Sequence, residues 1–257
     1  MKRFLIIPDI KNIGSSLQLA EEYSLGFEYN NFYDPSVLDN ETLLDEIIGE
    51  YKTHPLPDLA TSHGAFFDVI PFSLDARIRE ISVMRIEQSI SVAEKIGARA
   101  VVFHTNYNPF LNSPVYVQGW IEQNAKFWSE VLENNPNISI YLENMFDTSP
   151  DIIRELSERL SAYENYGVCL DYAHAALSDV PPHVWAECLG KYVKHVHIND
   201  NDLKSDLHLP WGSGLIDKKL FYDSYEKHMR DATVLIETAG TDNQRISIER
   251  FKKDGFI

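Results

Sequence analysis

Residues 138–171, ISIYLENMFDTSPDIIRELSERLSAYENYGVCLD, decide how this chain folds. A short apolar run, Ile138–Glu143, is followed by an amphipathic stretch and then by a second apolar run, Val168–Asp171. In the stretch between them apolar residues recur at helical spacing, and Ser149-Pro150 is typical of a helix N-cap with proline at the first helical position. Runs that are apolar almost throughout are typical of strands covered on both faces, so the segment predicts a strand–helix–strand unit of a parallel sheet.

The same alternation extends over the whole chain. The strand candidates are Phe4–Pro8, Gly26–Asn30, Leu59–His63, Ala100–His104, Ile138–Glu143, Val168–Asp171, Val193–Ile198 and Val234–Glu237. Helical patterns cover 78–96, with Gly97 as a C-cap, and 120–132. Eight strands that alternate with helices over this length favour a (β/α)8 barrel, or TIM barrel, over an open doubly wound sheet. Because no linker or low-complexity tract interrupts the pattern, we expect a single domain over residues 1–257.

Composition narrows the classes of partner and compartment. The formal net charge of −16 argues against a nucleic-acid binder, since such binding depends on Lys and Arg that neutralise phosphates. No stretch resembles a membrane span, and Met1–Asp9 is interpreted as the first strand and not as a signal peptide. Cys169 and Cys188 form no close pair, so we expect two reduced thiols in a cytoplasmic protein.

Six consecutive strand candidates carry a metal-binding residue type at or near their last position. These residues are His63, His104, Glu143, Asp171, His197 and Glu237. In a barrel these strand ends point at one mouth, where barrel enzymes place their chemistry. Acids and imidazoles gathered there would repel one another or stay unsatisfied unless a cation joined them. Mixed nitrogen and oxygen ligands favour Zn, Mn, Fe or Co over an all-oxygen Mg or Ca site.

The segments that follow the strands add further ligand candidates. Asp171-Tyr172-Ala173-His174 places an imidazole just beyond a strand-end carboxylate. Asp206 and His208 are two residues apart, so an extended segment would direct both side chains to the same side. Gly212 and Gly214, which follow, allow tight turns or a close approach of the backbone to a ligand.

Each of these residues also has a simpler interpretation. A single histidine at a strand end is more often hydrogen-bonded to backbone, and a single carboxylate is more often a helix cap or an ion-pair partner; only the joint placement favours a metal. We expect the histidines at 54, 183 and 228 to be solvated. His195 shares the strand parity of His197 and is expected to point inward beneath it. For Glu28 the sequence leaves two alternatives, a side chain that faces the mouth and a structural salt bridge.

The site motifs resemble those of the xylose-isomerase-like TIM barrel superfamily, which contains sugar isomerases, epimerases and dehydratases as well as endonuclease IV. The motifs that carry the resemblance are Ser62-His63-Gly64, Phe103-His104-Thr105, Leu142-Glu143-Asn144, Leu170-Asp171-Tyr172-Ala173-His174, His195-Val196-His197-Ile198-Asn199-Asp200, the loop from Asp206-Leu207-His208 to Gly212-Ser213-Gly214-Leu215-Ile216-Asp217, and Ile236-Glu237-Thr238. By this resemblance a sugar epimerase would hold one metal through Glu143, Asp171, His197 and Glu237. Its two glutamates, Glu143 and Glu237, would be catalytic and exchange a proton of the substrate.

The resemblance to endonuclease IV implies a larger ligand set and three zinc ions. That set is His63, His104, Glu143, Asp171, His174, His197, Asp206, His208 and Glu237. Three functions therefore stay open: a divalent-metal-dependent isomerase, epimerase or dehydratase for a sugar, sugar-phosphate or keto-polyol; a multi-zinc phosphoester hydrolase; and a barrel that binds metal or sugar without catalysis. The expected cofactor is one to three ions of Mn, Co or Zn, and the expected partner is a small carbohydrate. The oligomeric state is left open, a homo-oligomer included.

Overall fold

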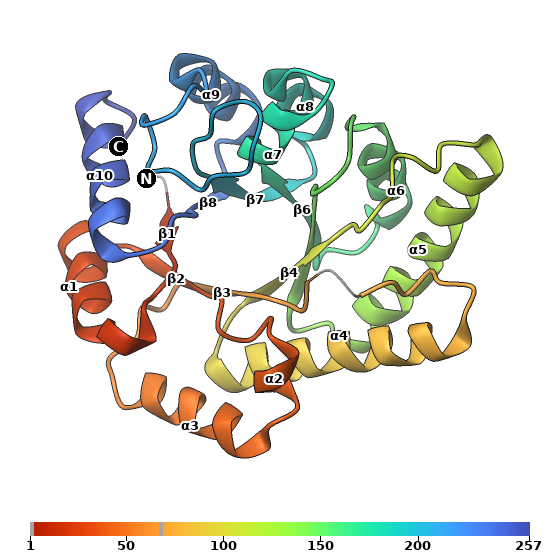
Figure 1. Ribbon diagram of the computed structural model, residues 1–257, viewed down its shortest axis with the longest axis horizontal. Coiled ribbons are helices and arrows are strands. Elements are labelled where there is room, and N and C mark those ends of the chain that lie inside the picture. Colours follow the sequence, from red (N-terminus) through yellow and green to blue (C-terminus); the bar gives the residue numbers. More distant parts are fainter. Residues whose placement is uncertain (1–2, 67–68) are drawn as a thin grey trace.

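Eight parallel strands close into one barrel in the order of the sequence, β1 to β8, in the computed structural model, which describes residues 3–66 and 69–257 (Figure 1). The strands are β1 (Phe4–Ile6), β2 (Gly26–Tyr29), β3 (Ala60–His63), β4 (Ala100–His104), β5 (Ser139–Glu143), β6 (Tyr166–Asp171), β7 (Val193–Ile198) and β8 (Thr233–Ile236). Each lies within two residues of its predicted bounds, and the predicted (β/α)8 barrel is confirmed. The predicted first strand falls on β1, while Met1 and Lys2 lie outside the described residues.

Helices surround the ring of strands on the outside (Figure 1). They are α1 (Ile13–Tyr23), α2 (Pro35–Leu38), α3 (Glu41–Lys52), α4 (Ala76–Ile96), α5 (Pro114–Asn134), α6 (Asp151–Leu160), α7 (Tyr172–Leu177), α8 (Pro182–Leu189), α9 (Lys218–Ser224) and α10 (Thr241–Lys253), with a 3-10 turn at Ile10–Asn12 and a π-helical turn at Tyr225–Met229. They bury one face against strands that are buried almost throughout, which is why these strands are apolar on both sides.

Local signals fix where helices begin and end. The carboxylate of Asp75 accepts a hydrogen bond of 2.8 Å from the N–H of Arg77 at the start of α4. At the other end Gly97 has φ +81°, a left-handed conformation that glycine adopts without strain, and it caps the helix as predicted.

The prediction that Ser149 caps α6 is wrong. The helix begins at Asp151, Pro150 occupies the cap position, and no side chain caps the helix. The hydroxyl of Ser149 instead donates to the carboxylate of Asp151, at 3.0 Å, so its oxygen is not directed at the helix N–H groups. An exposed acid in the first helical turn competed for that hydroxyl, and the sequence motif did not take this into account.

The register between strands brings their carboxyl ends to one level. His104 pairs with Glu143 across β4 and β5, and Asp171 pairs with His197 across β6 and β7. Residues aligned in neighbouring parallel strands lie side by side, so these four side chains occupy one rim of the barrel.

Two further predictions concern the chain as a whole. Cys169 is buried and Cys188 half-buried, and both are free thiols, which confirms the absence of a disulfide between them. Over the described residues, no helix combines the length and the apolar character that crossing a membrane requires.

Candidate metal centre

The nine residues predicted as ligands all converge at the carboxyl ends of the strands. Three groups of donor atoms form there, and within each group the atoms lie within 4.8 Å of one another. The groups are His63, His104 and Glu143; Glu143, Asp171 and His197; and His174, Asp206 and His208. The mouth thus brings together residues that are more than 140 positions apart in the sequence.

Glu143, at the end of β5, joins the first two groups. Its Oε2 lies 3.4 Å from Nε2 of His63 and 3.6 Å from Nε2 of His104. Its Oε1 lies 3.2 Å from Nδ1 of His197. The side chain is 1% exposed, so one buried carboxylate is shared by imidazoles from three strands.

Glu237 directly follows β8 and contacts the same imidazole of His197. Its Oε1 lies 3.5 Å from the same Nδ1 of His197, and its Oε2 lies 3.8 Å from Nδ1 of His208. The side-chain amide of Asn199 donates to Oε2 at 3.3 Å and holds the carboxylate in place.

The third group lies at the outer edge of the mouth. Asp206 Oδ2 lies 3.3 Å from Nε2 of His174 and 3.0 Å from Nε2 of His208. The side chains of Asp206 and His208 are 31% and 38% exposed, whereas the side chain of Glu143 is nearly inaccessible. The centre therefore has a buried floor and a rim open to solvent.

The glycines of the loop pack closely against Asp200, whereas the predicted approach of their backbone to a ligand stays a prediction. Gly212 has φ +79°, and its N–H donates to Asp200 at 2.9 Å. A Cβ at Gly214 would lie 2.4 Å from a carboxylate oxygen of Asp200, so no larger residue fits there without rearrangement. His208 itself adopts φ +47°, an uncommon conformation for a residue other than glycine.

Hydrogen bonds to backbone carbonyls fix the ring orientation of three histidines at the mouth. Nδ1 of His63, His174 and His208 lies 3.0, 2.9 and 3.1 Å from the carbonyl oxygens of residues 64, 144 and 237. In the neutral form of each ring, donation of the Nδ1–H to the carbonyl would leave Nε2 free to bind a metal.

A cation fits the chemistry of these donors. Among the described residues, no hydrogen bond reaches either carboxylate oxygen of Glu143, Oδ2 of Asp171 or Nδ1 of His197, although all four atoms are buried. Unsatisfied buried polar atoms of this kind are costly, and a bound ion would satisfy them together.

The pKa values of the buried acids reflect their crowding. Burial raises the pKa of Asp171, and the negative charges of Glu237 and Glu143 add to that rise. Burial opposes ionisation of Glu143 too, but the positive charge of His197, together with the contacts from His197 and His63, outweighs it and holds the pKa of Glu143 well below its ordinary value. Burial lowers the pKa of His104 to about 3, so that this imidazole is neutral and able to ligate.

Two asparagines that the sequence interpretation did not single out position the ligands. Asn144 accepts from the backbone N–H of Asp171 and donates to its carbonyl, both at 2.9 Å. Asn199 holds Glu237, as described above. Both follow a ligand-bearing strand by one residue, and that position was the available signal.

Residues left aside by the sequence interpretation lie elsewhere. His54 is half-buried beside Glu50, and His183 and His228 are half-buried outside the mouth, so full solvation is not observed for any of the three. His195 points into the barrel beneath His197, as predicted. Glu28 lies there too and is not among the residues that line the mouth cavity: its carboxylate oxygens lie 3.0 and 3.1 Å from Nε2 of His195 and His197.

A cavity of about 290 Å³ lies over the centre. Its floor contains His63, His174 and Glu237, and one wall is formed by Phe66 and Tyr33, whose rings stack 4.1 Å apart at 11°. No lysine or arginine is among the described residues that line it. The cavity therefore combines polar ligands with an aromatic wall and has room for a small molecule.

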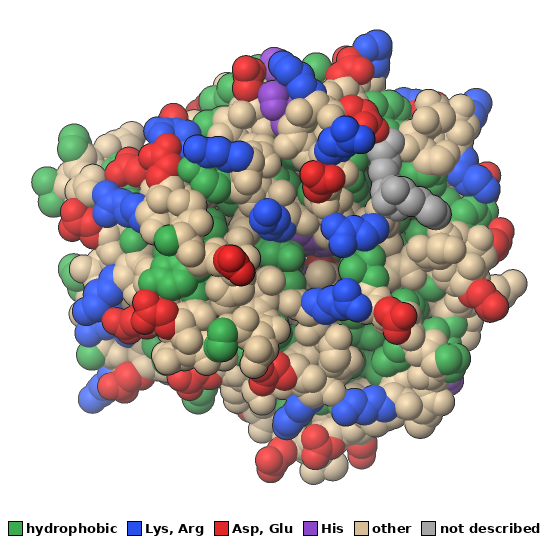
Figure 2. Space-filling view, turned by 180° about the vertical axis from the view of Figure 1, so that it is seen from behind, with side chains coloured by type: hydrophobic (Ala, Val, Ile, Leu, Met, Phe, Trp, Pro, Cys, Tyr) green, Lys and Arg blue, Asp and Glu red, His purple; other side chains and the backbone are tan. Residues whose placement is uncertain are grey.

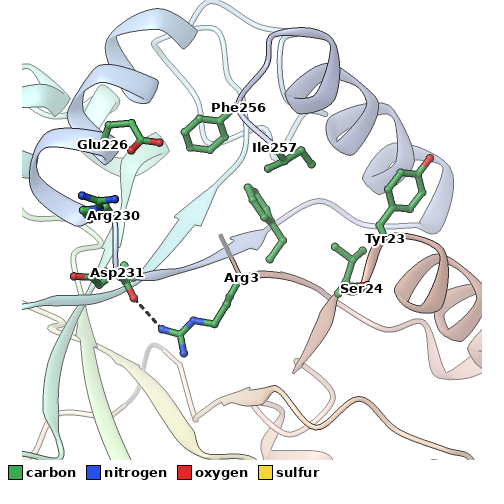
Figure 3. Close-up of a pocket in the computed structure, with 11 residues that line it drawn as sticks. Arg3, Tyr23, Ser24, Glu226, Arg230, Asp231, Phe256 and Ile257 are labelled. Carbon is green, nitrogen blue, oxygen red and sulfur yellow. Dashed lines mark hydrogen bonds between the residues drawn. The ribbon is translucent and has the colours of Figure 1, made fainter. Parts of the chain in front are cut away.

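A larger cavity, of about 660 Å³, lies beside the starts of β1 and β8 (Figure 3). Arg3, Glu226, Arg230 and Asp231 line it, together with Phe256, and Arg3 donates to the carbonyl oxygen of Asp231. The described residues around it include no histidine or cysteine. Its volume exceeds that of the mouth cavity, but its side chains do not form a metal site.

A closed parallel barrel with histidines and carboxylates gathered at the carboxyl-end mouth defines a TIM barrel with a candidate metal centre. A model of the xylose isomerase-like TIM barrel family matches residues 19–253. The chain belongs to this family, which confirms the resemblance seen in the sequence.

Individual relatives agree with this family. The chain is 30% identical to the uncharacterized protein MJ1311 of Methanocaldococcus jannaschii over 192 residues, which cover 66% of this chain and 65%, just under two thirds, of that protein. A crystal structure of a D-tagatose 3-epimerase-like protein has a TM-score of 0.76 at 23% identity, covering 98% of this chain and 96% of that chain. The TTHB071 protein of Thermus thermophilus, soaked with ZnCl2, has a TM-score of 0.73 at 21% identity, covering 97% and 99%. At these identities the structures show a shared fold.

Proposed function

We propose that this protein is a divalent-metal-dependent isomerase, epimerase or dehydratase that acts on a sugar, sugar-phosphate or keto-polyol by proton transfer next to a carbonyl. The observation that carries the proposal is the pair of buried carboxylates, Glu143 and Glu237, which lie 3.2 and 3.5 Å from the same imidazole nitrogen, Nδ1 of His197. Two carboxylates this close to one site can remove a proton from a substrate carbon and return it.

The core of the metal centre in this proposal is Glu143, Asp171, His197 and Glu237. Its donor set of one imidazole and three carboxylates suits Mn, Co or Zn. A cation held there would polarise the carbonyl of the substrate as a Lewis acid. The TTHB071 protein, which shares the fold and was soaked with ZnCl2, supports a site of this kind.

The chain itself orients the substrate and excludes water. The side chains of Glu143 and His197 are at most 1% exposed, so the floor of the cavity is shielded from bulk solvent. His63 and His174 present ring nitrogens that can hydrogen-bond sugar hydroxyls, and Tyr33 and Phe66 offer an aromatic wall to the carbons of a sugar ring. The likeness to a D-tagatose 3-epimerase-like protein supports a carbohydrate substrate.

A second candidate is a multi-zinc phosphoester hydrolase. The outer group of His174, Asp206 and His208 favours it, because a single-metal isomerase does not need these ligands. Two observations weigh against it: the described lining of the mouth contains no lysine or arginine, and the chain carries a net charge of −16. On the side of the molecule shown in Figure 2, basic and acidic side chains are interspersed, so that side has no continuous basic surface for DNA.

Solvent exchange tests the first proposal. The protein loaded with Mn, Co or Mg is incubated in D2O with a panel of ketoses, and deuterium at the carbon next to the carbonyl is measured by NMR. Incorporation is expected with at least one sugar, and it is expected to be lost in Glu143→Gln and Glu237→Gln. The matched control, Glu158→Gln, alters an exposed glutamate on α6 and should exchange like the wild type. No exchange across the panel contradicts the proposal.

Metal stoichiometry separates the two candidates. Protein purified without added metal is analysed for metal content, and one ion per chain is expected. Two or three zinc ions per chain, with Asp206 and His208 among the ligands, would favour the hydrolase.

The free thiols of Cys169 and Cys188 agree with a reducing, cytoplasmic compartment, which we propose as the location.

A further inference from the structure

A buried polar network lies inside the barrel directly beneath the proposed metal centre. Its middle is Glu28 of β2, which is inaccessible to solvent and pairs in register with Thr61 of β3, two residues before His63. One carboxylate oxygen of Glu28, Oε2, accepts from the hydroxyl of Thr61 at 2.6 Å and from Nε2 of His195 at 3.0 Å. Glu28 is thereby held in a fixed orientation.

The other oxygen of Glu28 faces a proposed ligand. Oε1 lies 3.1 Å from Nε2 of His197, and among the described residues neither atom forms a hydrogen bond in this structure. Nδ1 of the same ring lies 3.2 Å from Glu143 and 3.5 Å from Glu237. One imidazole ring therefore separates Glu28 from the carboxylates of the centre.

His197 is turned the opposite way from the histidines around it. His63, His174 and His208 direct Nδ1 to backbone carbonyls and Nε2 to the acids of the mouth. His197 directs Nδ1 to the acids and Nε2 down into the barrel, where the carboxylate of Glu28 lies in reach and Cys169 is also a neighbour.

The orientation of this ring matters for metal binding. A neutral imidazole carries one proton, so Nδ1 can bind a cation only when the proton sits on Nε2. A carboxylate that accepts the Nε2–H fixes this tautomer and makes the ring a stronger ligand.

We propose that Glu28 is a positioning residue that accepts the Nε2–H of His197 and thereby presents the unprotonated Nδ1 to the metal. The proposal rests on the metal centre proposed above. Glutamine cannot replace this carboxylate, because Glu28 receives donors on both oxygens and an amide would turn its own NH2 toward one of them. A purely structural ion pair would instead affect the stability of the fold and leave the affinity of the folded protein for metal unchanged.

Cobalt binding distinguishes these roles. The metal-free full-length protein is titrated with Co2+, followed by visible absorption and calorimetry, and folding of each variant is checked by circular dichroism and urea unfolding. Glu28→Gln is expected to bind Co2+ about 10–100-fold more weakly than the wild type. The control is Asp147→Asn, a buried carboxyl that also accepts from a threonine hydroxyl at 2.6 Å and that, among the described residues, has no hydrogen bond to a proposed ligand; it should bind Co2+ within about threefold of the wild type.

The outcomes distinguish a failure of the role proposed for Glu28 from a failure of the proposed metal centre. If the folded wild-type protein does not bind Co2+, the metal centre itself is wrong. If the wild type binds and folded Glu28→Gln binds equally well, the metal centre stands and the role of Glu28 is overturned.

A measurement on the wild type covers the case in which Glu28→Gln does not fold. In zinc-loaded protein labelled with 15N on histidine, and assigned with a His197→Gln variant, His197 is expected to show a slowly exchanging proton on Nε2 and a metal-bound Nδ1. A proton on Nδ1 with Nε2 bound to metal would overturn the proposal.

Discussion

Each end of the barrel carries a cavity, and the larger cavity is not the one that lies over metal-binding side chains. The cavity beside the starts of β1 and β8 has about 660 Å³ and is lined by arginines, acids and aromatic rings, whereas the mouth cavity has about 290 Å³ and lies over a buried centre of imidazoles and carboxylates. The charged groups of the larger cavity, such as Arg3 and Asp231, lie at the exposed surface, where water satisfies them. At the mouth, both carboxylate oxygens of Glu143 and Oδ2 of Asp171 are buried without a hydrogen-bond donor among the described residues. The cost of burial, and not cavity volume, is therefore what marks the end at which we propose the function.

The largest expected effect contrasts an acid from each end. Glu237→Gln is expected to lower the rate of solvent deuterium exchange by about 10³-fold or more, because general acid–base catalysis contributes about 10²–10⁴-fold. Asp231→Asn, in the larger cavity, should leave the rate unchanged. Rates are measured by NMR under identical metal loading. Equal losses in both variants would break the contrast between the two ends.

The next largest effect is a pH dependence of fold stability that comes from Asp147, a buried acid beside the mouth. Burial raises the pKa of Asp147 to about 6, although hydrogen bonds from Thr105 and Met145 lower it. Since its pKa is higher in the folded than in the unfolded chain, the protonated form stabilises the fold below about pH 4, and this contribution is lost as the pH rises through about 6.

Urea unfolding of the metal-free protein from pH 4 to pH 7 checks this titration. Relative to Asp147→Asn, the wild type should lose about 3 kcal/mol over that range, at about 1.4 kcal/mol per pKa unit. Parallel stability curves for the two proteins would show that Asp147 does not titrate in this window.

Metal removal should affect the mouth alone. With the free cation at about 100 times its Kd, binding should stabilise the fold by about 2.7 kcal/mol, and EDTA should remove that contribution. Asp171→Asn should respond much less to the cation, whereas Arg230→Ala should respond like the wild type. Thermal unfolding with and without chelator gives the comparison; an equal response of all three proteins would place the cation elsewhere.

The smallest effect is expected at the opposite end. Arg3 donates a hydrogen bond to the carbonyl oxygen of Asp231 at the surface, so Arg3→Ala should change the free energy of unfolding by less than about 0.5 kcal/mol. Cobalt affinity and exchange rate should be unaffected. A clear loss of either would give the larger cavity a role that its side chains do not suggest.

Much of the site was predictable because strand ends are visible in the sequence. His104, Glu143 and Asp171 each follow a short, largely apolar run, and His63 ends a short run that also contains Thr61 and Ser62. Closing the barrel brings such ends together whatever the lengths of the loops between them. Local competition between polar groups was harder to predict, as Ser149 shows: its hydroxyl could bond either to the helix backbone or to Asp151, and both lie nearby in the sequence.

The sequence by itself determined the barrel, the level of the ligands and the likeness to the family, because alternation of apolar and polar residues encodes which side chains face inward. Only the tertiary structure decided the depth of Glu28, which pairs with Thr61 and lies below the mouth. It also decided that His197 directs Nδ1 to the acids. The physical reason is that depth and ring orientation depend on the register between neighbouring strands and on hydrogen-bond partners from distant strands, and neither is written in the pattern of one segment.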